Sequence, residues 1–232
     1  MMKRLLPLPV IWLVVVSLWL SGCSPAQTQP QQQELHGNTM GTTYNVTFFS
    51  PEPVDSESLQ QQLEVELELI NDLMSTYRPE SELMRFNRQQ SSEPFTVSEQ
   101  TAKVVAEAIR IGKQTSGVLD ITVGPLVELW GFGASGRITE RPEPAQLTAI
   151  TDYVGIDKIS LNNNQLVKAD PRLALDLSTI AKGYGVDRLA DILEHNGITD
   201  YLVDIGGEMR VSGAKPDREW RVAIEKPVAG NR

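Results

Sequence analysis

The stretch LALDLSTIAKGYGVDRLADIL, residues 173–193, changes its hydrophobic period halfway along. Its first half alternates apolar and polar residues, which is typical of a β-strand. Its second half places Val186, Leu189, Ala190 and Leu193 at spacings of three and four, which predicts one buried face of a helix. We therefore expect a strand that passes directly into a helix, with small and polar residues at the junction.

The junction between these halves has the composition of an anion-binding turn. It contains two hydroxyl residues, a lysine and two glycines, namely Ser178, Thr179, Lys182, Gly183 and Gly185. The first turn of a helix has unpaired N–H groups and a partial positive charge, which attract phosphate, and glycine lets a ligand approach the backbone. Asp176 stands just before the junction, where it could accept a hydrogen bond from a ligand. Spacing alone favours a phosphate site and a tightly packed turn equally, because neither common glycine-rich phosphate motif is present.

The N-terminus has the pattern of a secretory signal. Two basic residues precede an apolar run over residues 5–20, and the sequence LSGC follows. The run is too short for a comfortable membrane span, which needs about 20 apolar residues. LSGC resembles the lipobox of bacterial lipoproteins, with an ordinary signal peptide as the alternative. We expect residues 1–22 to be the signal, Cys23 to carry the lipid, and the polar residues 23–35 to be a flexible tether.

Charge and histidine content exclude several classes of function. The chain of 232 residues has a net charge of −9, and removal of the two basic residues in the signal would leave −11. This charge argues against nucleic acid or anionic lipid as a partner, although backbone amides and a metal could still bind a phosphorylated ligand. The two histidines, His36 and His195, are far apart in the sequence, which argues against a zinc site or a His-based triad.

From residue 36 onward the patterns predict one α+β domain with mixed or antiparallel sheets and flanking helices. We expect strands at residues 42–50, 198–213 and 220–227, helices at 55–77, 98–114 and 144–155, and a hairpin at 156–170 that turns at 162–164. Asp55 or Ser56 would cap the first helix, and Gly197 would end the helix of the opening stretch. Asp204 ends an apolar strand before Gly206 and Gly207, which would form a bulge or approach a ligand closely.

Each long helix has a predicted buried face. The buried residues would be Leu59, Leu63, Leu67, Ile70 and Met74 in the first helix, and Val104, Val105, Ala108 and Ile111 in the second. Glu64, Glu66 and Glu68 of the first helix would then form a solvent-exposed face and not a metal site.

Five motifs together resemble the flavin transferase (ApbE) family. They are TMGTTYNV (39–46), MSTYRPESELMRFN (74–87), SGVLDITVGPLVELWGFG (116–133), LDLSTIAKGYGVDRLA (175–190) and YLVDIGGEMRVSG (201–213). They follow the family's order behind the lipobox and cover most of the chain. The resemblance implies an ApbE-like, T-fold-related single domain over residues 36–232. It also implies an enzyme that binds FAD as a substrate, transfers its FMN half to a threonine of a target flavoprotein with Mg²⁺, and releases AMP.

The resemblance also implies roles for particular residues. The positions that would contact FAD are Met40, Tyr77, Val118, Leu119, Asp120, Asp176 and Lys182. Thr179 would provide a ligand to Mg²⁺ through its backbone carbonyl. Each has a structural alternative, such as a core position for Met40 and Tyr77 or a strand cap for Asp120.

The family's later motifs are not found in this sequence. Members continue with segments that carry the other Mg²⁺ ligands, including the acidic residue implicated in catalysis, which we expect beyond residue 232. We expect the chain to be a fragment, with a C-terminal part missing, because a sheet without its partner strands would leave edges and apolar surface exposed. An incomplete homologue is the alternative.

Three functions remain open on this basis. The first is FAD:protein FMN transferase, acting on threonines of periplasm-facing flavoproteins such as subunits of membrane redox complexes. The second is Mg²⁺-dependent hydrolysis of FAD to FMN and AMP, and the third is a non-catalytic flavin-binding lipoprotein. In each case the lipid would hold the domain on the periplasmic side of a bacterial membrane, inner or outer.

Overall fold

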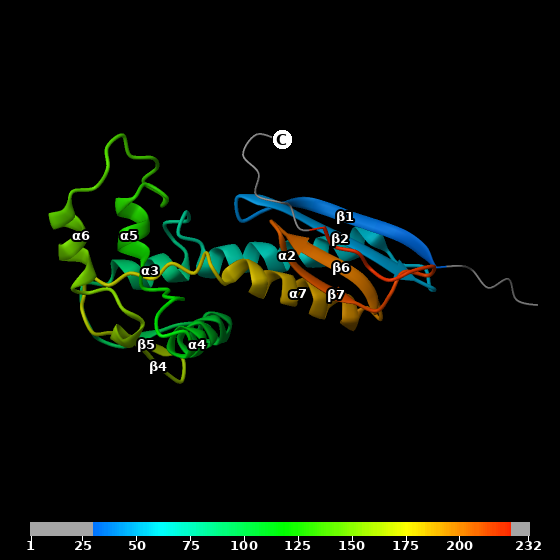
Figure 1. The fold of residues 1–232 in the computed structure, drawn as a ribbon. Coiled ribbons are helices and arrows are strands. Elements are labelled where there is room, and N and C mark those ends of the chain that lie inside the picture. Colours follow the sequence, from blue (N-terminus) through cyan, green and yellow to red (C-terminus); the bar gives the residue numbers. More distant parts are fainter. Residues whose placement is uncertain (1–29, 224–232) are drawn as a thin grey trace, which may run out of the picture.

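The computed structural model describes residues 30–223 (Figure 1). The strands are β1 (Gln31–Thr39), β2 (Thr42–Ser50), β3 (Phe95–Thr96), β4 (Ile159–Asn162), β5 (Gln165–Lys168), β6 (Asp200–Ile205) and β7 (Glu208–Ser212). The helices are α2 (Ser56–Met74), α3 (Glu82–Arg88), α4 (Glu99–Gln114), α5 (Gly124–Leu129), α6 (Pro144–Thr151) and α7 (Ala181–His195). A single 3₁₀ turn, Ile156–Lys158, leads into β4. The predicted signal peptide and Cys23 lie outside the described residues.

The strands form two antiparallel sheets. The larger sheet has the order β1-β2-β6-β7, and the smaller one has the order β3-β5-β4. Figure 1 shows the larger sheet, with α2 and α7 side by side along it, at one end of the molecule. The smaller sheet and the remaining helices lie at the other end. The predicted α+β class with antiparallel sheets and flanking helices is confirmed.

One face of the larger sheet packs against α2 and α7. Alternate residues of β2 and β6 point to this face, because successive side chains of a strand lie on opposite sides. The buried residues of this face include Tyr44, Val46, Phe48, Tyr201, Val203 and Ile205. They contact the predicted leucine stripe of α2 and the predicted apolar face of α7. The 3.6-residue period therefore predicted both helices and their buried sides correctly.

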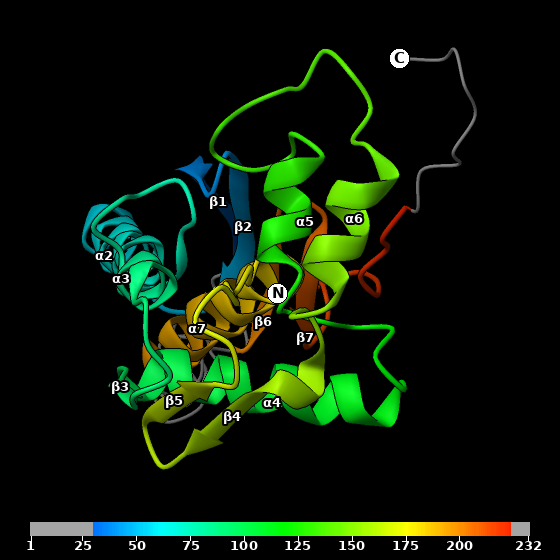
Figure 2. The same ribbon diagram turned by 90° about the vertical axis from the view of Figure 1, so that its left-hand side faces the viewer.

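A second core lies between the smaller sheet, α3 and α4. It contains Phe86 of α3, Val105 and Ala108 of α4, and Leu166 of β5. Figure 2 shows α4 alongside β4, with α5 and α6 side by side above them. Met40, in the turn between β1 and β2, packs against both cores and so connects the two ends of the molecule.

The predicted tether is wrong from residue 31 onward. β1 begins at Gln31, which pairs with Ser50 of β2, so residues 31–35 belong to the sheet. His36 also lies in this strand. The sequence concealed the strand because β1 is at the edge of the sheet, where most of its side chains are polar and exposed, and Leu35 is its one buried apolar residue.

The predicted strand at the start of the opening stretch does not form. Leu173, Leu175 and Leu177 are fully buried at alternate positions, as a strand pattern predicts. The backbone, however, makes only an isolated parallel bridge, between Ala174 and Val123. Alternation thus predicted which side chains are buried but not how the backbone is hydrogen-bonded. The helix that follows begins at Ala181 and ends before Gly197, which has a φ of 76°, as expected.

The predicted strand at residues 220–227 is also wrong for residues 220–223, which the structure describes. Residues 220–223 are not in a strand, and residues 224–227 lie outside the described range. Trp220 instead donates a hydrogen bond from Nε1 to the carbonyl oxygen of Ser212 at 3.0 Å. Its ring packs against Phe49 at a centroid distance of 5.8 Å. Trp220 thereby covers part of the sheet face opposite α2 and α7.

The acidic face of α2 is only partly exposed to solvent. Glu64 and Glu68 are exposed as predicted, whereas the side chain of Glu66 is 14% exposed and accepts a hydrogen bond from Arg188 Nε at 2.8 Å. The prediction for Glu66 is wrong because α7 runs beside α2 and places Arg188 against this position.

Tyr201 makes the fold sensitive to alkaline pH. Burial and the nearby Glu194 carboxylate raise its pKa from 10.0 to about 12. The folded protein therefore retains the hydroxyl proton that the unfolded chain loses, so stability falls as pH rises from 10 toward 12. We expect the Tyr201→Phe variant to lose less stability than wild type between pH 9 and 11.5 in denaturant titrations. A stability curve for Tyr201→Phe that runs parallel to the wild-type curve would contradict the assignment.

Candidate functional site

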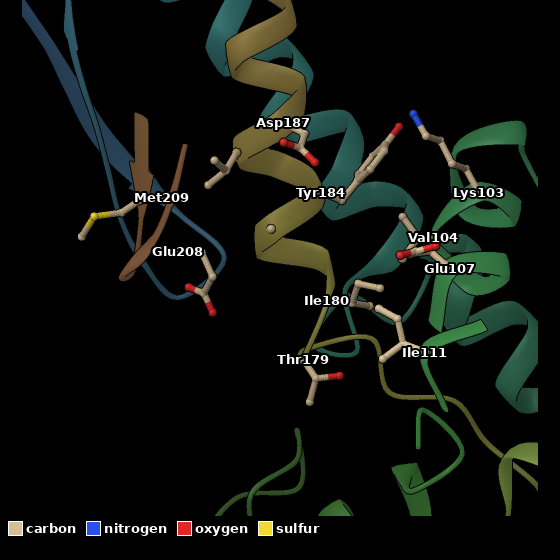
Figure 3. Close-up of a pocket in the computed structure, with 12 residues that line it drawn as sticks. Lys103, Val104, Glu107, Ile111, Thr179, Ile180, Tyr184, Asp187, Glu208 and Met209 are labelled. Atoms are coloured by element: carbon tan, nitrogen blue, oxygen red, sulfur yellow. The ribbon is translucent and has the colours of Figure 1, made fainter. Parts of the chain in front are cut away.

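A pocket of about 490 Å³ lies between α4, the first turns of α7, and the start of β7 (Figure 3). Its polar lining comes from Lys103 and Glu107 of α4, Thr179 and Asp187 near and in α7, and Glu208 of β7. Apolar side chains, among them Val104, Ile111, Ile180 and Met209, form the rest of the lining. Both the size and the mixed lining are typical of sites for small molecules.

The first turn of α7 presents its backbone to this pocket. Ile180 is the N-cap residue and makes no side-chain capping bond. The N–H of Ala181 donates to the carbonyl oxygen of Leu177 at 2.8 Å, and within residues 30–223 no partner is found for the N–H groups of Lys182 and Gly183. Gly183 lines the pocket, and a Cβ added to it would find no atom within 4 Å. Because glycine is unfavourable inside a helix and packing does not require it here, the open backbone is available to a ligand.

Gly185, two residues further along, has a different role. A Cβ at this position would lie 3.2 Å from both Met40 Cε and Ile205 Cδ1. This glycine lets α7 pack closely on the larger sheet and on the turn that contains Met40. The sequence left two interpretations open, a phosphate site and a tightly packed turn. Gly183, which faces open space, fits the first, and Gly185, which allows tight packing, fits the second.

Lys182 does not line the pocket, and its side chain forms an ion pair with Glu208 at the start of β7. Its Nζ lies 2.9 Å from Glu208 Oε2, and both side chains are partly exposed. Glu208, which lines the pocket, therefore neutralises the lysine nearest to it. Tyr184 also lines the pocket, and burial raises the pKa of its hydroxyl above the usual 10.0.

The structure brings the segments of Asp120 and Asp176 together. The backbone N–H of Asp176 donates to the carbonyl oxygen of Ile121 at 2.8 Å. Asp176 Oδ1 accepts the N–H of Ser178 at 2.8 Å, and Asp120 Oδ1 accepts the N–H and hydroxyl of Thr122 at 2.8 and 2.6 Å. Each carboxylate therefore uses one oxygen to fix its own turn.

The second oxygen of Asp176 is free to bind a ligand. The side chain is largely buried, and no hydrogen bond to Oδ2 is found within residues 30–223. In that same range no buried side-chain nitrogen or oxygen lacks a partner, so Oδ2 must retain some accessible surface. Asp176 does not line the pocket described above, but its segment leads directly into Thr179, which does.

The other predicted contact residues lie on exposed loops or in the core. Tyr77 is 64% exposed, and its hydroxyl donates to the carbonyl oxygen of Phe132 at 3.1 Å, which joins the second and third motifs. Val118 is 88% exposed, whereas Leu119 packs against the core of the smaller sheet. None of these three residues lines the pocket.

Sequence reasoning missed the residues that α4 contributes. Lys103 and Glu107 are one helical turn apart on the face of α4 that meets α7, and Lys103 Nζ lies 5.9 Å from the centre of the Tyr184 ring. Their spacing is that of an ordinary exposed helix face, so no local signal distinguishes them. For Glu208 the sequence did contain a signal, because this residue directly follows the glycine pair after Asp204.

The described residues do not form a complete metal site. Thr179 lines the pocket, but within residues 30–223 no group of three or more His, Cys, Asp or Glu side chains is placed to hold a metal ion. Mg²⁺ requires near-octahedral oxygen ligands, of which Thr179 could be one. The same part of the chain contains no helix that is long and apolar enough to cross a membrane.

The fold and pocket define an α+β protein with a ligand-sized site at the start of a helix, and comparison with known proteins identifies its family. The ApbE family matches residues 40–232. A protein of Vibrio cholerae named FAD:protein FMN transferase is 49% identical over 225 residues, which cover 95% of this chain and 66% of that protein. One of the same name from Haemophilus influenzae is 44% identical, with 93% and 64% covered. The chain belongs to the ApbE family.

Solved structures agree with this assignment. The flavin transferase ApbE from Vibrio cholerae aligns with a TM-score of 0.82 and 52% identity, covering 85% of this chain and 65% of that one. The apo form of the flavinyl transferase ApbE from Pseudomonas stutzeri aligns with a TM-score of 0.80 and 34% identity, covering 84% and 66%. The chain thus spans about two thirds of the length of the relatives it matches.

Proposed function

We propose that this protein is an FAD:protein FMN transferase. The observation that carries the proposal is the start of α7, where an uncapped helix N-terminus and the open backbone of Gly183 border a pocket of suitable size. This arrangement suits the diphosphate of a dinucleotide. Family membership and relatives named for this activity support FAD as that dinucleotide.

The proposed reaction is a phosphoryl transfer. The hydroxyl oxygen of an acceptor threonine attacks the phosphorus of the FMN half of FAD, and the bond between that phosphorus and the bridging oxygen breaks. AMP leaves with the bridging oxygen, and the hydroxyl proton passes to a base or to solvent. Such a reaction depends mainly on positioning and on stabilising negative charge at the phosphoryl oxygens.

Residues of this chain would serve the binding and orientation steps. The free N–H groups at the start of α7 would hold phosphate oxygens, and Asp176 Oδ2 would accept a hydrogen bond from FAD. Met40, Tyr77, Val118, Leu119, Asp120 and Lys182 are proposed as further contacts on the basis of the family motifs. A bound Mg²⁺ would supply charge neutralisation, with Thr179 as one ligand, but the described residues alone do not complete its site.

The proposed setting is the periplasmic side of a bacterial membrane. Cys23, if lipidated, would anchor the domain there, and acceptors would be threonines of flavoproteins that face the same compartment. The lipobox LSGC and the preceding apolar run support this setting.

One assay tests the proposed activity. The protein encoded by the complete gene is incubated with FAD, Mg²⁺ and a threonine-bearing acceptor domain, and covalent flavin fluorescence and AMP are followed together. Labelled acceptor and AMP in equal amounts are expected. AMP and free FMN without labelling would identify a hydrolase instead, and bound FAD without AMP would identify a non-catalytic flavin-binding protein.

The ion pair between Lys182 and Glu208 gives a prediction about affinity. The variant Glu208→Gln removes a negative charge from the pocket and releases Lys182, so without metal it should bind FAD about two- to fivefold more tightly than wild type at low salt. The gain should shrink as salt is added. Fluorescence titration with FAD measures this effect, with the exposed Glu57→Gln as control. Weaker binding by Glu208→Gln would show that Glu208 helps to hold the ligand.

A further inference from the structure

The segment that carries Asp176 is buried but has few backbone partners. Leu173, Leu175 and Leu177 are fully buried, yet the segment forms no ladder with a neighbouring strand. At its two ends the backbone is bound within turns, where Leu173 N–H donates to Asp170 and the carbonyl oxygen of Leu177 accepts from Ile180 and Ala181. Between these ends, its backbone contacts are the isolated bridge from Ala174 and the hydrogen bond from Asp176 N–H to the carbonyl oxygen of Ile121. Buried N–H and C=O groups need partners, so the remaining groups must be satisfied by other means.

The side chain of Asn87 provides one of these partners. Asn87 Nδ2 donates to the carbonyl oxygen of Leu175 at 2.8 Å, and Asn87 Oδ1 accepts the N–H of Leu175 at 2.8 Å. Its carboxamide thus pairs with both backbone groups of one residue, as an opposing strand would. Asparagine suits this position because it presents one donor and one acceptor at a fixed distance.

The pair fixes the residue directly before Asp176. Leu175 is bound on both its polar groups by Asn87, and the next N–H, that of Asp176, is bound by Ile121. The peptide plane between Leu175 and Asp176 is therefore held from two sides. Since Asp176 Oδ1 is bound to Ser178, this plane sets where the free Oδ2 points.

We propose that Asn87 is a positioning residue, which aims the Asp176 carboxylate at FAD through the backbone of Leu175. This inference rests on the proposed function and deepens it. Asn87 lies at the end of α3, in the same motif as Tyr77. It therefore connects the motif that contains Tyr77 to the segment that contains Asp176, and both of these residues are proposed FAD contacts. A residue that only stabilised the fold would leave the affinity of the folded protein for FAD unchanged.

The experiment compares Asn87→Asp and Asn87→Leu with wild type in FAD titrations, under conditions where circular dichroism shows every variant folded. At pH 8 the new carboxylate of Asn87→Asp has no N–H to donate, so it loses the hydrogen bond to the carbonyl oxygen of Leu175 and repels that oxygen. The Asp176 carboxylate should then be misplaced, and FAD should bind about tenfold more weakly. Asn87→Leu, whose side chain can neither donate nor accept a hydrogen bond, should also bind FAD more weakly than wild type.

A remote destabilised variant provides the control. Asp55→Ala removes the cap of α2, where Asp55 Oδ1 accepts the N–H of Ser58 at 3.1 Å, and should lower stability without changing FAD affinity. Unchanged FAD affinity in both Asn87 variants, with wild type binding normally, would overturn the inference and leave the proposed function standing. Absence of FAD binding by wild type would overturn both proposals.

Discussion

The Lys168→Met variant is expected to lose about 2–5 kcal/mol of its free energy of unfolding at pH 7, because one buried and one partly buried carbonyl oxygen would lose their donor. Lys168 is fully buried, and its Nζ donates to the carbonyl oxygens of Phe86, Asn87 and Leu173 at 3.2, 3.4 and 3.1 Å. The carbonyl of Phe86 has a second partner in the N–H of Gln89, so the loss falls on the other two. Denaturant titration measures the change.

The pH dependence of this effect separates Lys168 from an ordinary buried residue. Burial lowers the pKa of Lys168 below its usual 10.5, so the unfolded chain holds the proton more tightly than the folded protein. The contribution of Lys168 to the free energy of unfolding should therefore increase as pH rises, from the lowered pKa of the folded protein up to about 10.5. Lys168→Met should lack this rise. The exposed Lys113→Met is the matched control, and equal losses in both variants would contradict the prediction.

The Asp176→Asn variant is expected to bind FAD about 10- to 100-fold more weakly than wild type, since it removes a charge-assisted hydrogen bond of about 1.5–3 kcal/mol. Asparagine retains an oxygen that can accept the N–H of Ser178, so the turn should survive and the loss should concern the ligand alone. Fluorescence titration gives the affinity, and circular dichroism checks the fold.

Asp55→Asn is the control for this substitution. Asp55 also accepts a backbone N–H, that of Ser58 three residues further along, but it caps α2 at the end far from Tyr77. Asparagine is an equally good cap, so stability and FAD affinity should both match wild type. An Asp176→Asn protein with wild-type affinity would remove Asp176 from the proposed site.

The sequence predicted the elements whose pattern reflects their surroundings. The leucine stripe of α2 and the apolar face of α7 were predicted because each helix buries one side against the sheet. β1 was missed because a strand at the edge buries a single apolar residue and so leaves little pattern. At residues 173–178, the alternation of apolar and polar residues showed which side chains are buried. It could not show the backbone pairing, because a paired strand and a buried segment held by side chains have the same alternation.

The site was only partly predictable for a related reason. Asp176, Thr179 and Gly183 lie close in sequence, so one local motif contained them. Lys103 and Glu107 reach the pocket only because α4 packs beside α7, and nothing in the sequence of α4 marks that neighbour. The role of Asn87 was equally hidden, since its partner Leu175 is 88 residues away along the chain.

The start of β1 at Gln31 limits how far the domain could extend from a membrane. Seven residues, 24–30, separate the predicted lipidated cysteine from the first residue of the sheet, which is eight residue steps along the chain. A fully extended chain of that length spans at most about 28 Å. If Cys23 carries a lipid and the protein has the proposed transferase activity, only acceptor threonines that lie within roughly one domain diameter of the bilayer could reach its site.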